Sequence, residues 1–164
     1  PEINPYSLKD LKKLHGVMTQ YTVDESGVFR KGEEGVFNGD KCIFIAPPAR
    51  LVPGLMEELF DWMSREQAIR TPSYPVSVFH YEFVFIHPFS DGNGRMARLW
   101  HTAILSKWNR FLSTSRLSQI EKFQDGYYQA IAQCHSEGTS NIFIEFMLKQ
   151  VDMVLDDISK QISD

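Results

Sequence analysis

The chain has 164 residues, of which 43% are hydrophobic and 13% aromatic, and it carries a formal net charge of -4 at pH 7. A chain of this length suits one domain with a single core, and this composition excludes global disorder. The negative charge argues against a general nucleic-acid binder, and no apolar run is long enough to span a bilayer. We therefore expect neither nucleic acid nor a membrane among its partners.

The two cysteines, Cys42 and Cys134, lie far apart in the sequence and fit no metal-binding spacing. We expect two reduced thiols in a cytoplasmic protein, because disulfides are rare in that compartment. No signal peptide is visible, and the chain begins at Pro1 instead of a methionine. We expect a further segment upstream of Pro1.

The first predicted element is a helix that begins at Ser7, because Ser7 and Asp10 form a variant of the capping box. Residues 28–46 predict a β-hairpin instead. Asn38-Gly39 is a tight-turn signal that separates Val36-Phe37 from the strand-forming run Cys42 to Ile45. Two prolines then end the hairpin.

Helical spacing returns at Pro53, after which Leu55, Leu59 and Met63 repeat every four residues. The segment Val76 to Ile86 fits two structures. Its residues have high strand propensity, yet they also fit a central helix that is apolar nearly all round.

Three more helices are predicted toward the C-terminus. The first runs from Arg95 to Trp108. The second begins at the capping box formed by Ser118 and Glu121, continues through Phe123, Tyr127 and Ile131, and stops at Gly138. The third runs from Phe143 to Ile162. The sequence therefore predicts a mainly α domain with one hairpin.

The chemistry is concentrated between His87 and Arg98. Pro88 biases His87 away from the α region, so a preceding helix should end at His87 and present its imidazole beside a turn. The unperturbed pKa of histidine, near 6.5, suits a general base at neutral pH. His15, His80 and His101 lack such neighbours, and we expect them to be structural.

The stretch Asp91-Gly92-Asn93-Gly94 predicts an anion-binding turn, because glycine and asparagine tolerate positive φ and let successive N–H groups converge. The helix that follows adds its free N–H groups and the positive end of its dipole. Arg95 and Arg98 share one helical face, so both can reach the same phosphates. A carboxylate at Asp91 beside phosphates is typical of a Mg²⁺ ligand. Together these features predict phosphoryl or nucleotidyl transfer.

This stretch resembles the signature of the Fic family, His-Pro-Phe-x-(Asp/Glu)-Gly-Asn-Gly-Arg-x-x-Arg, at every specified position. Bacterial Fic domains are also similar at Asn4-Pro5-Tyr6-Ser7, Val36-Phe37-Asn38-Gly39, Ala46-Pro47-Pro48, Tyr127-Tyr128-Gln129-Ala130 and Phe143-Ile144-Glu145-Phe146. The resemblance implies a single Fic domain over 1–164. It implies a compact bundle around a central helix-loop-helix, a helix over Val76 to Ile86, a catalytic loop at 87–95 and a hairpin flap.

The resemblance further implies a protein adenylyltransferase that moves AMP from ATP to a Ser, Thr or Tyr hydroxyl and releases pyrophosphate. His87 would be the base, Asp91 would hold Mg²⁺, and Phe89 would anchor the loop in the core. The expected nucleotide-binding residues are Asn38, Gly39, Asp91, Gly92, Asn93, Gly94, Arg95, Met96, Ala97, Arg98, Tyr127 and Tyr128. The target protein would add as a strand to the flap through Val36, Phe37, Asn38, Lys41 and Ile43.

Other functions stay open at this point. Gly92 to Ala97 also fits G-x-G-x-x-A, a dinucleotide fingerprint that needs alternating βα units. Relatives of the Doc type phosphorylate and carry lysine where this chain has Gly94, so glycine favours AMP transfer. Phosphorylation, another nucleotidyl transfer, removal of AMP and a catalytically silent toxin-partner module are the alternatives.

Many Fic proteins are inhibited by a helix that carries the motif (Ser/Thr)-x-x-x-Glu-(Gly/Asn). The glutamate of this motif pairs with the second arginine of the loop. Neither Glu34-Gly35 nor Glu137-Gly138 fits this motif. Three alternatives follow: an inhibitory helix lies upstream of Pro1, which we favour, a separate antitoxin supplies it, or the protein is unrestrained. We expect any such inhibitor to contact Arg98. The family often carries asparagine where this chain has His135.

Overall fold

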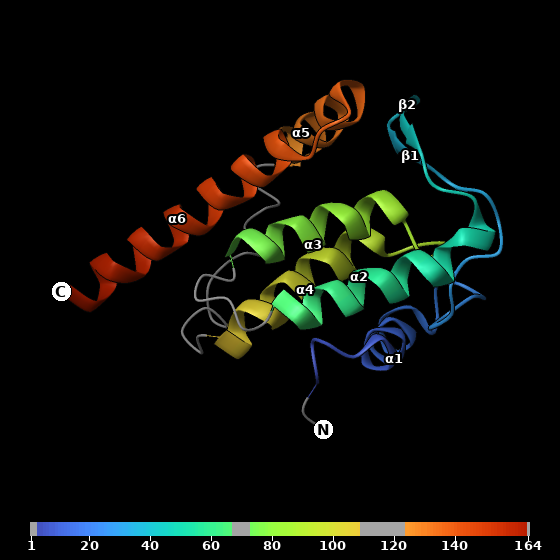
Figure 1. The fold of residues 1–164 in the computed structure, drawn as a ribbon, viewed down its shortest axis with the longest axis horizontal. Coiled ribbons are helices and arrows are strands. Elements are labelled where there is room, and N and C mark those ends of the chain that lie inside the picture. The colour runs from blue at the N-terminus through green and yellow to red at the C-terminus, as the bar shows by residue number, and fades with distance from the viewer. Residues whose placement is uncertain (1–2, 67–72, 109–123, 164) are drawn as a thin grey trace.

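In a computed structural model, the described part of the chain comprises residues 3–66, 73–108 and 124–163 (Figure 1). This part is mainly α-helical, as predicted, and its two strands form one antiparallel hairpin. In chain order the elements are α1 (Leu8–Thr19), β1 (Gly35–Asn38), β2 (Lys41–Ile45), the 3-10 helix η1 (Ala49–Leu51), α2 (Val52–Glu66), α3 (Ser73–Ile86), α4 (Asn93–Trp108), α5 (Gln124–Glu137) and α6 (Asn141–Ser163).

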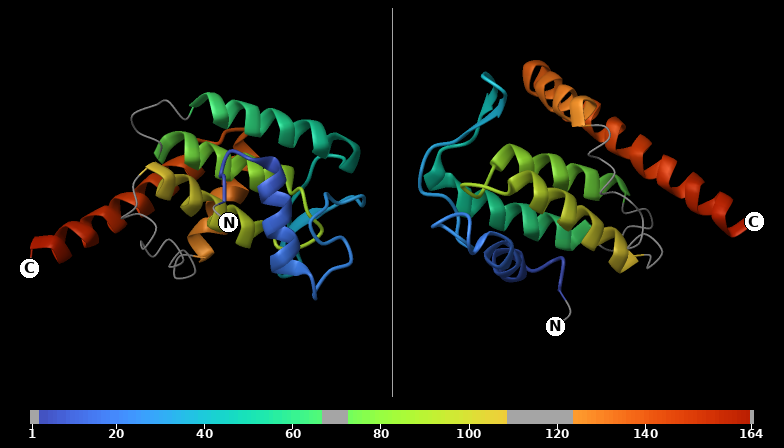
Figure 2. Two further views of the ribbon diagram at one scale, coloured as in Figure 1. Left: turned by 90° about the horizontal axis from the view of Figure 1, so that it is seen from below. Right: turned by 180° about the vertical axis from the view of Figure 1, so that it is seen from behind.

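Helix α3 is the centre of the domain. It contacts α2, α4 and α6. Helix α1 crosses the bundle on the side opposite α5 and α6 (Figures 1 and 2). Val76, Phe79 and Phe83 of α3 are fully buried. Because helices cover it on several sides, a segment with high strand propensity is stable as a helix, and the helix expected from the family resemblance is confirmed.

The start of α1 confirms the predicted cap. The Ser7 hydroxyl accepts a hydrogen bond from the Asp10 N–H at 3.2 Å. In a complete capping box the Asp10 carboxylate would accept from the Ser7 N–H. Here it accepts from the Asn4 N–H at 2.9 Å instead. The indole of Trp100 donates to the Pro5 carbonyl at 2.9 Å and ties this segment to α4.

The hairpin turns one residue later than the Asn38-Gly39 signal suggests. Asn38 pairs with Lys41, which leaves Gly39-Asp40 as the two-residue loop, and Gly39 has a φ of 60°. On β2, Phe44 is buried against Phe85 of α3 and His135 of α5, with ring centroids 5.7 and 5.2 Å away. The hairpin is therefore attached to the body through one face of β2.

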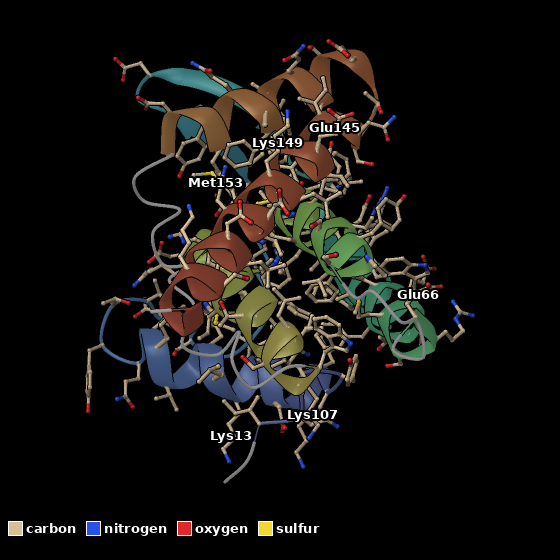
Figure 3. All side chains as sticks on the ribbon, turned by 90° about the vertical axis from the view of Figure 1, so that its left-hand side faces the viewer. Lys13, Glu66, Lys107, Glu145, Lys149 and Met153 are labelled. Atoms are coloured by element: carbon tan, nitrogen blue, oxygen red, sulfur yellow. The ribbon has the colours of Figure 1, made fainter. Side chains whose placement is uncertain are left out.

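Helices α5 and α6 form an antiparallel pair whose turn is marked by Gly138, with a φ of 65° at the predicted stop. Part of α6 extends beyond the bundle (Figures 1 and 2). Glu145, Lys149 and Met153 lie on its outward side at intervals of four residues (Figure 3). The predicted capping box at Ser118 and Glu121, with Phe123 after it, lies outside the described residues.

Both cysteines are free thiols, as predicted, with Cys42 exposed and Cys134 buried. Within the described ranges, no helix combines the length and apolarity needed to cross a bilayer. The same residues contain no parallel sheet, so the dinucleotide fingerprint read from Gly92 to Ala97 is wrong: its alternating βα units are absent there.

Candidate active site

The loop that joins α3 to α4 lies at the end of the molecule that also carries the hairpin (Figure 1). Helix α3 ends at Ile86, as Pro88 requires, and His87 adopts a φ of 51°. Among the described residues it is the one non-glycine residue with positive φ. Such a conformation costs free energy and persists only where the surrounding structure holds it.

The ring of His87 is oriented by its own helix. Nδ1 lies 3.3 Å from the Val84 carbonyl, and because a carbonyl oxygen only accepts, Nδ1 carries the proton. Nε2 of the neutral ring therefore keeps its lone pair. Burial lowers the pKa of His87, and the nearby Arg30 acts in the same direction, while the Val84 hydrogen bond and Asp91 oppose them. His87 is thus a neutral imidazole suited to accept a proton.

Phe89 anchors the loop in the core, as expected. It is fully buried, stacks on His15 with centroids 3.7 Å apart, and contacts Phe29 and Phe83. The buried side chain of Asn93 closes the loop around it: Oδ1 accepts from the Phe89 N–H at 2.9 Å and Nδ2 donates to the Phe89 carbonyl at 2.6 Å. The Asn93 side chain is therefore committed to loop closure.

Gly92 starts helix α4 in a conformation that other residues rarely adopt. Its φ is 80°, and a Cβ there would lie 2.8 Å from the Met18 methyl group. The Met96 N–H donates to the Gly92 carbonyl at 2.9 Å. The N–H groups of Asn93, Gly94 and Arg95 thus belong to the first turn, where helices have no internal acceptors and bind anions.

Two guanidinium groups lie beside this helix start. Arg95 donates to the Asp91 carboxylate at 2.9 Å, and both side chains are about half exposed. Arg98 reaches back toward Gly94, since its Nη1 is 3.5 Å from where a Cβ of that glycine would lie. Within the residues that the structure describes, Arg98 has no ion-pair partner. Arg98 can bind a phosphate-bearing ligand directly, whereas Arg95 would first have to leave the Asp91 carboxylate.

Three residues expected to bind nucleotide have buried side chains. Met96 and Ala97 are fully buried, because they occupy the face of α4 opposite its solvent-exposed side. Tyr127 is 3% exposed, and its hydroxyl bonds Nε2 of His80 at 3.1 Å. These three side chains belong to the core, and the contact of these residues with a nucleotide stays a prediction. Tyr128 is partly exposed next to Tyr127.

The hairpin β1–β2 carries the residues that are expected to bind the target protein. Gly39 forms the hairpin turn beside Asn38, and Phe37 is 58% exposed on β1. The side chains of Val36, Asn38, Lys41 and Ile43 lie outside the described part of the structure, so their contacts with a target stay predictions. His135 packs its ring on Phe44 of the hairpin.

His15 and Arg30 contribute to the site without having been predicted to do so. His15 donates from Nε2 to the Asp91 carbonyl at 2.9 Å, and its Nδ1 accepts from the Gly27 N–H at 3.0 Å. Arg30 is buried and donates to the His87 carbonyl at 2.6 Å. Both residues bond to backbone groups. Because every residue has these groups, no sequence motif marks such contacts. Only the helical face shared by Leu11 and His15 indicated that His15 points inward.

The assembled site combines a neutral base, an exposed carboxylate, two cations and the first turn of α4, whose N–H groups have no acceptors within the helix. A proton acceptor beside an anion-binding surface is the arrangement that transfer of a phosphate-containing group requires. Phosphate oxygens would face the first turn of α4 and the two guanidinium groups.

Comparison with known proteins identifies the family. The profile of the Fic/DOC family matches residues 5–105. A probable protein adenylyltransferase of Aquifex aeolicus is 36% identical over 77 residues, which cover 47% of this chain and 23% of that protein. The protein adenylyltransferase Fic of Nematostella vectensis is 32% identical over 135 residues, covering 80% of this chain and 29% of that protein.

A solved structure agrees with the fold. The Fic family protein from Desulfovibrio desulfuricans G20 superposes with a TM-score of 0.86 at 39% identity, over 96% of this chain and 49% of that chain. The chain thus spans less than a third of the two curated relatives and about half of the solved protein. Because the family profile covers more than half of the chain and includes the whole loop described above, this chain belongs to the Fic/DOC family.

Proposed function

We propose that this chain is a protein adenylyltransferase that transfers AMP from ATP to a hydroxyl group of another protein. The observation that carries the proposal is the neutral His87, whose Nδ1 is bonded to the Val84 carbonyl so that Nε2 can accept a proton, in the loop that leads directly into α4. Relatives from Aquifex aeolicus and Nematostella vectensis, which bear the name protein adenylyltransferase, support AMP as the transferred group.

In the proposed reaction, the acceptor oxygen forms a bond with the α-phosphorus of ATP. The bond from that phosphorus to the oxygen bridging to the β-phosphate breaks, and pyrophosphate leaves with the electron pair. The hydroxyl proton passes to Nε2 of His87. The first-turn N–H groups of α4, together with Arg95 and Arg98, hold the phosphate oxygens and stabilise the negative charge that develops there.

Mg²⁺ fits this proposal. The Asp91 carboxylate is half exposed beside the start of α4, and Mg²⁺ on nucleotides is usually held by one or two carboxylates together with phosphate oxygens and water. Asp91 would hold the ion, and Arg95 would then release its 2.9 Å contact with that carboxylate and turn to the phosphates. The ion would neutralise charge on the phosphates.

The acceptor would dock on the hairpin by strand addition. A two-stranded sheet leaves backbone groups unpaired at its outer edges, and these can pair with an extended segment of another protein. The exposed ring of Phe37 would add an apolar contact. We further propose that the reaction takes place in the cytoplasm, since the two free thiols suit a reducing compartment.

Labelled ATP tests the proposal. The chain is incubated with Mg²⁺, a cell lysate that supplies acceptors, and ATP labelled on either its α- or its γ-phosphate. Label that enters protein only when this chain is present should come from the α-phosphate and not from the γ-phosphate. Protein labelled only from the γ-phosphate would show phosphorylation instead and would overturn the proposal.

A matched substitution tests the base. Asparagine tolerates positive φ and can still donate to the Val84 carbonyl, but it cannot take up a proton at neutral pH. His87→Asn should therefore keep the fold and bind ATP normally. We expect it to lose AMP transfer by on the order of 100- to 10,000-fold, the usual contribution of a general base. Unchanged transfer would remove His87 from the catalytic role.

Regulation through Arg98 is a second part of the proposal. A glutamate from a segment before Pro1, or from a separate antitoxin, would pair with the Arg98 guanidinium and occupy the place of a terminal phosphate. A peptide that carries the family's inhibitory motif, added in excess, should then inhibit the chain. Arg98→Ala should bind that peptide more weakly, and equal binding would contradict the assignment.

A further inference from the structure

Arg30 is a buried cation between the hairpin and the catalytic loop. Its side chain is 3% exposed, although arginine is rarely buried without partners. A buried guanidinium without hydrogen-bond partners is strongly unfavourable, so the contacts of Arg30 indicate what it does in the structure. Among the described residues Arg30 forms no ion pair, and the Glu33 carboxylate accepts instead from the Ala49 N–H at 3.2 Å.

One half of the guanidinium caps the end of α3. Nε donates to the His87 carbonyl at 2.6 Å, and Nη2 donates to the Ile86 carbonyl at 3.2 Å. The backbone N–H of Arg30 adds a bond of 2.9 Å to the Pro88 carbonyl. A cation is favourable at the negative end of a helix dipole. These bonds also restrain the peptide units around His87, the residue with the costly positive φ.

The other half of the guanidinium holds both ends of the hairpin. Nη1 donates to the carbonyl of Gly32, which precedes β1, and Nη2 donates to the carbonyl of Pro47, which follows β2, at 2.8 and 2.6 Å. The two chain segments are themselves joined by the Ala46 N–H and the Glu34 carbonyl at 2.9 Å. One planar group thus contacts the hairpin base and the catalytic histidine at the same time.

We propose that Arg30 is a positioning residue that fixes the hairpin relative to the His87 imidazole, so that a hydroxyl on a docked chain lies within reach of Nε2. The inference rests on the proposed function, in which the hairpin receives the acceptor. Lysine cannot replace arginine here, because one ammonium cannot span carbonyls on opposite sides as the rigid fork does. The ATP phosphates would lie at α4, whose first turn Arg30 does not contact.

The test compares Arg30→Lys with Arg50→Lys, a matched change at an exposed arginine on η1. Three quantities are measured in each variant: transfer of α-label from ATP to acceptors in a cell lysate, affinity for ATP, and hydrogen exchange of the backbone amides over 35–45 and over α4. A displacement of about 1 Å between reacting groups can cost on the order of 100-fold in rate.

We expect Arg30→Lys to lose label transfer by about 10- to 100-fold and to speed hairpin exchange by a similar factor, since the anchoring bonds are lost. ATP affinity and exchange in α4 should stay as in the unmodified chain. A merely destabilised protein would instead weaken ATP binding and exchange faster everywhere. Arg50→Lys should change none of these quantities.

Unchanged hairpin exchange in a folded Arg30→Lys variant would overturn the inference, as would normal transfer despite faster exchange. If the unmodified chain transfers no label, the proposed function fails, but hairpin exchange still decides whether Arg30 anchors it. If Arg30→Lys does not fold, the Nε proton of Arg30 in the unmodified chain is followed by NMR. Its protection should match that of the hairpin amides, and rapid exchange would overturn the inference.

Discussion

At the scale of single residues, the site depends on backbone conformations that few residues tolerate. His87 and Gly92 both have positive φ, and they mark the two ends of the loop between α3 and α4. His87 accepts this strain because its N–H, its carbonyl and its ring all have partners, at Phe83, Arg30 and Val84. The result is a base whose free nitrogen is fixed in direction before any substrate binds.

The pH dependence of transfer follows from the environment of His87. Burial lowers the pKa of this histidine below its usual 6.5, and the base works only when it is unprotonated. The rate should therefore rise with pH, reach half of its plateau below pH 6.5, and be flat around pH 7. A pH profile of kcat/KM for labelled AMP transfer measures this, and a midpoint above pH 7 would contradict the assignment.

The two loop glycines should respond differently to alanine. At Gly92 a methyl group meets both a φ of 80° and the Met18 side chain at 2.8 Å, so Gly92→Ala should destabilise the fold by about 1–3 kcal/mol. At Gly94 the nearest atom is Nη1 of Arg98 at an ordinary 3.5 Å, so Gly94→Ala should fold normally. It should nevertheless weaken ATP binding, because the methyl group occupies phosphate space. Denaturation and ATP titration separate the two effects, and equal behaviour of the two variants would contradict this account.

At the scale of elements, α1 acts as a support for the catalytic loop. Its inward face carries His15, which joins the Asp91 carbonyl to the Gly27 N–H and stacks on Phe89. The same helix places Met18 and Thr19 against Gly92. A helix far from His87 in sequence therefore fixes the loop that carries the base.

Replacing His15 tests this support. His15→Phe keeps the stacking but removes the partners of the Asp91 carbonyl and the Gly27 N–H, and a polar group left unsatisfied where water cannot reach it costs about 1–3 kcal/mol. We expect a loss of stability in that range, together with weaker ATP binding. Lys13→Ala, at an exposed position of the same helix, is the control and should change neither quantity. Stability equal to that of the control would show that α1 does not hold the loop.

The ends and turns of several elements could be predicted from the sequence. Ser7 as a cap, Gly138 as a stop and the hairpin around Gly39 were all predictable, because each signal is local. Val76 to Ile86 was not decided by its own residues, since burial on several sides removes the periodic pattern that distinguishes a helix from a strand. The family resemblance supplied that answer.

The site was predictable to a similar degree. His87 and the glycines were evident from residue type and order, whereas Arg30 and His15 act on backbone carbonyls that any sequence would provide. The burial of Met96, Ala97 and Tyr127 depends on how α4 and α5 pack, which the motif does not specify.

At the scale of the whole molecule, the core contains histidines that stay neutral. Burial lowers the pKa of His101 to about 3 and also lowers that of His80, whose Nδ1 lies 3.3 Å from Nδ1 of His101. In the unfolded chain both would titrate near 6.5. Below that pH the unfolded chain therefore binds more protons than the folded one, and acid favours unfolding.

The free energy of unfolding should accordingly fall as pH drops from about 6.5 toward 4, by up to about 1.4 kcal/mol per pH unit for each such histidine. Urea denaturation at several pH values measures the slope. His101→Gln should lower the slope by the contribution of one histidine. Stability that is constant or increases over this range would contradict the neutral state of the buried pair.

The proposed transfer of AMP by the loop from His87 to Arg98 can be followed by intact-mass spectrometry of the protein acceptors. After incubation with ATP and Mg²⁺, acceptors should gain the mass of one AMP group, and the His87→Asn variant should leave them unmodified. A gain equal to one phosphate, or an AMP adduct that persists with His87→Asn, would contradict the account.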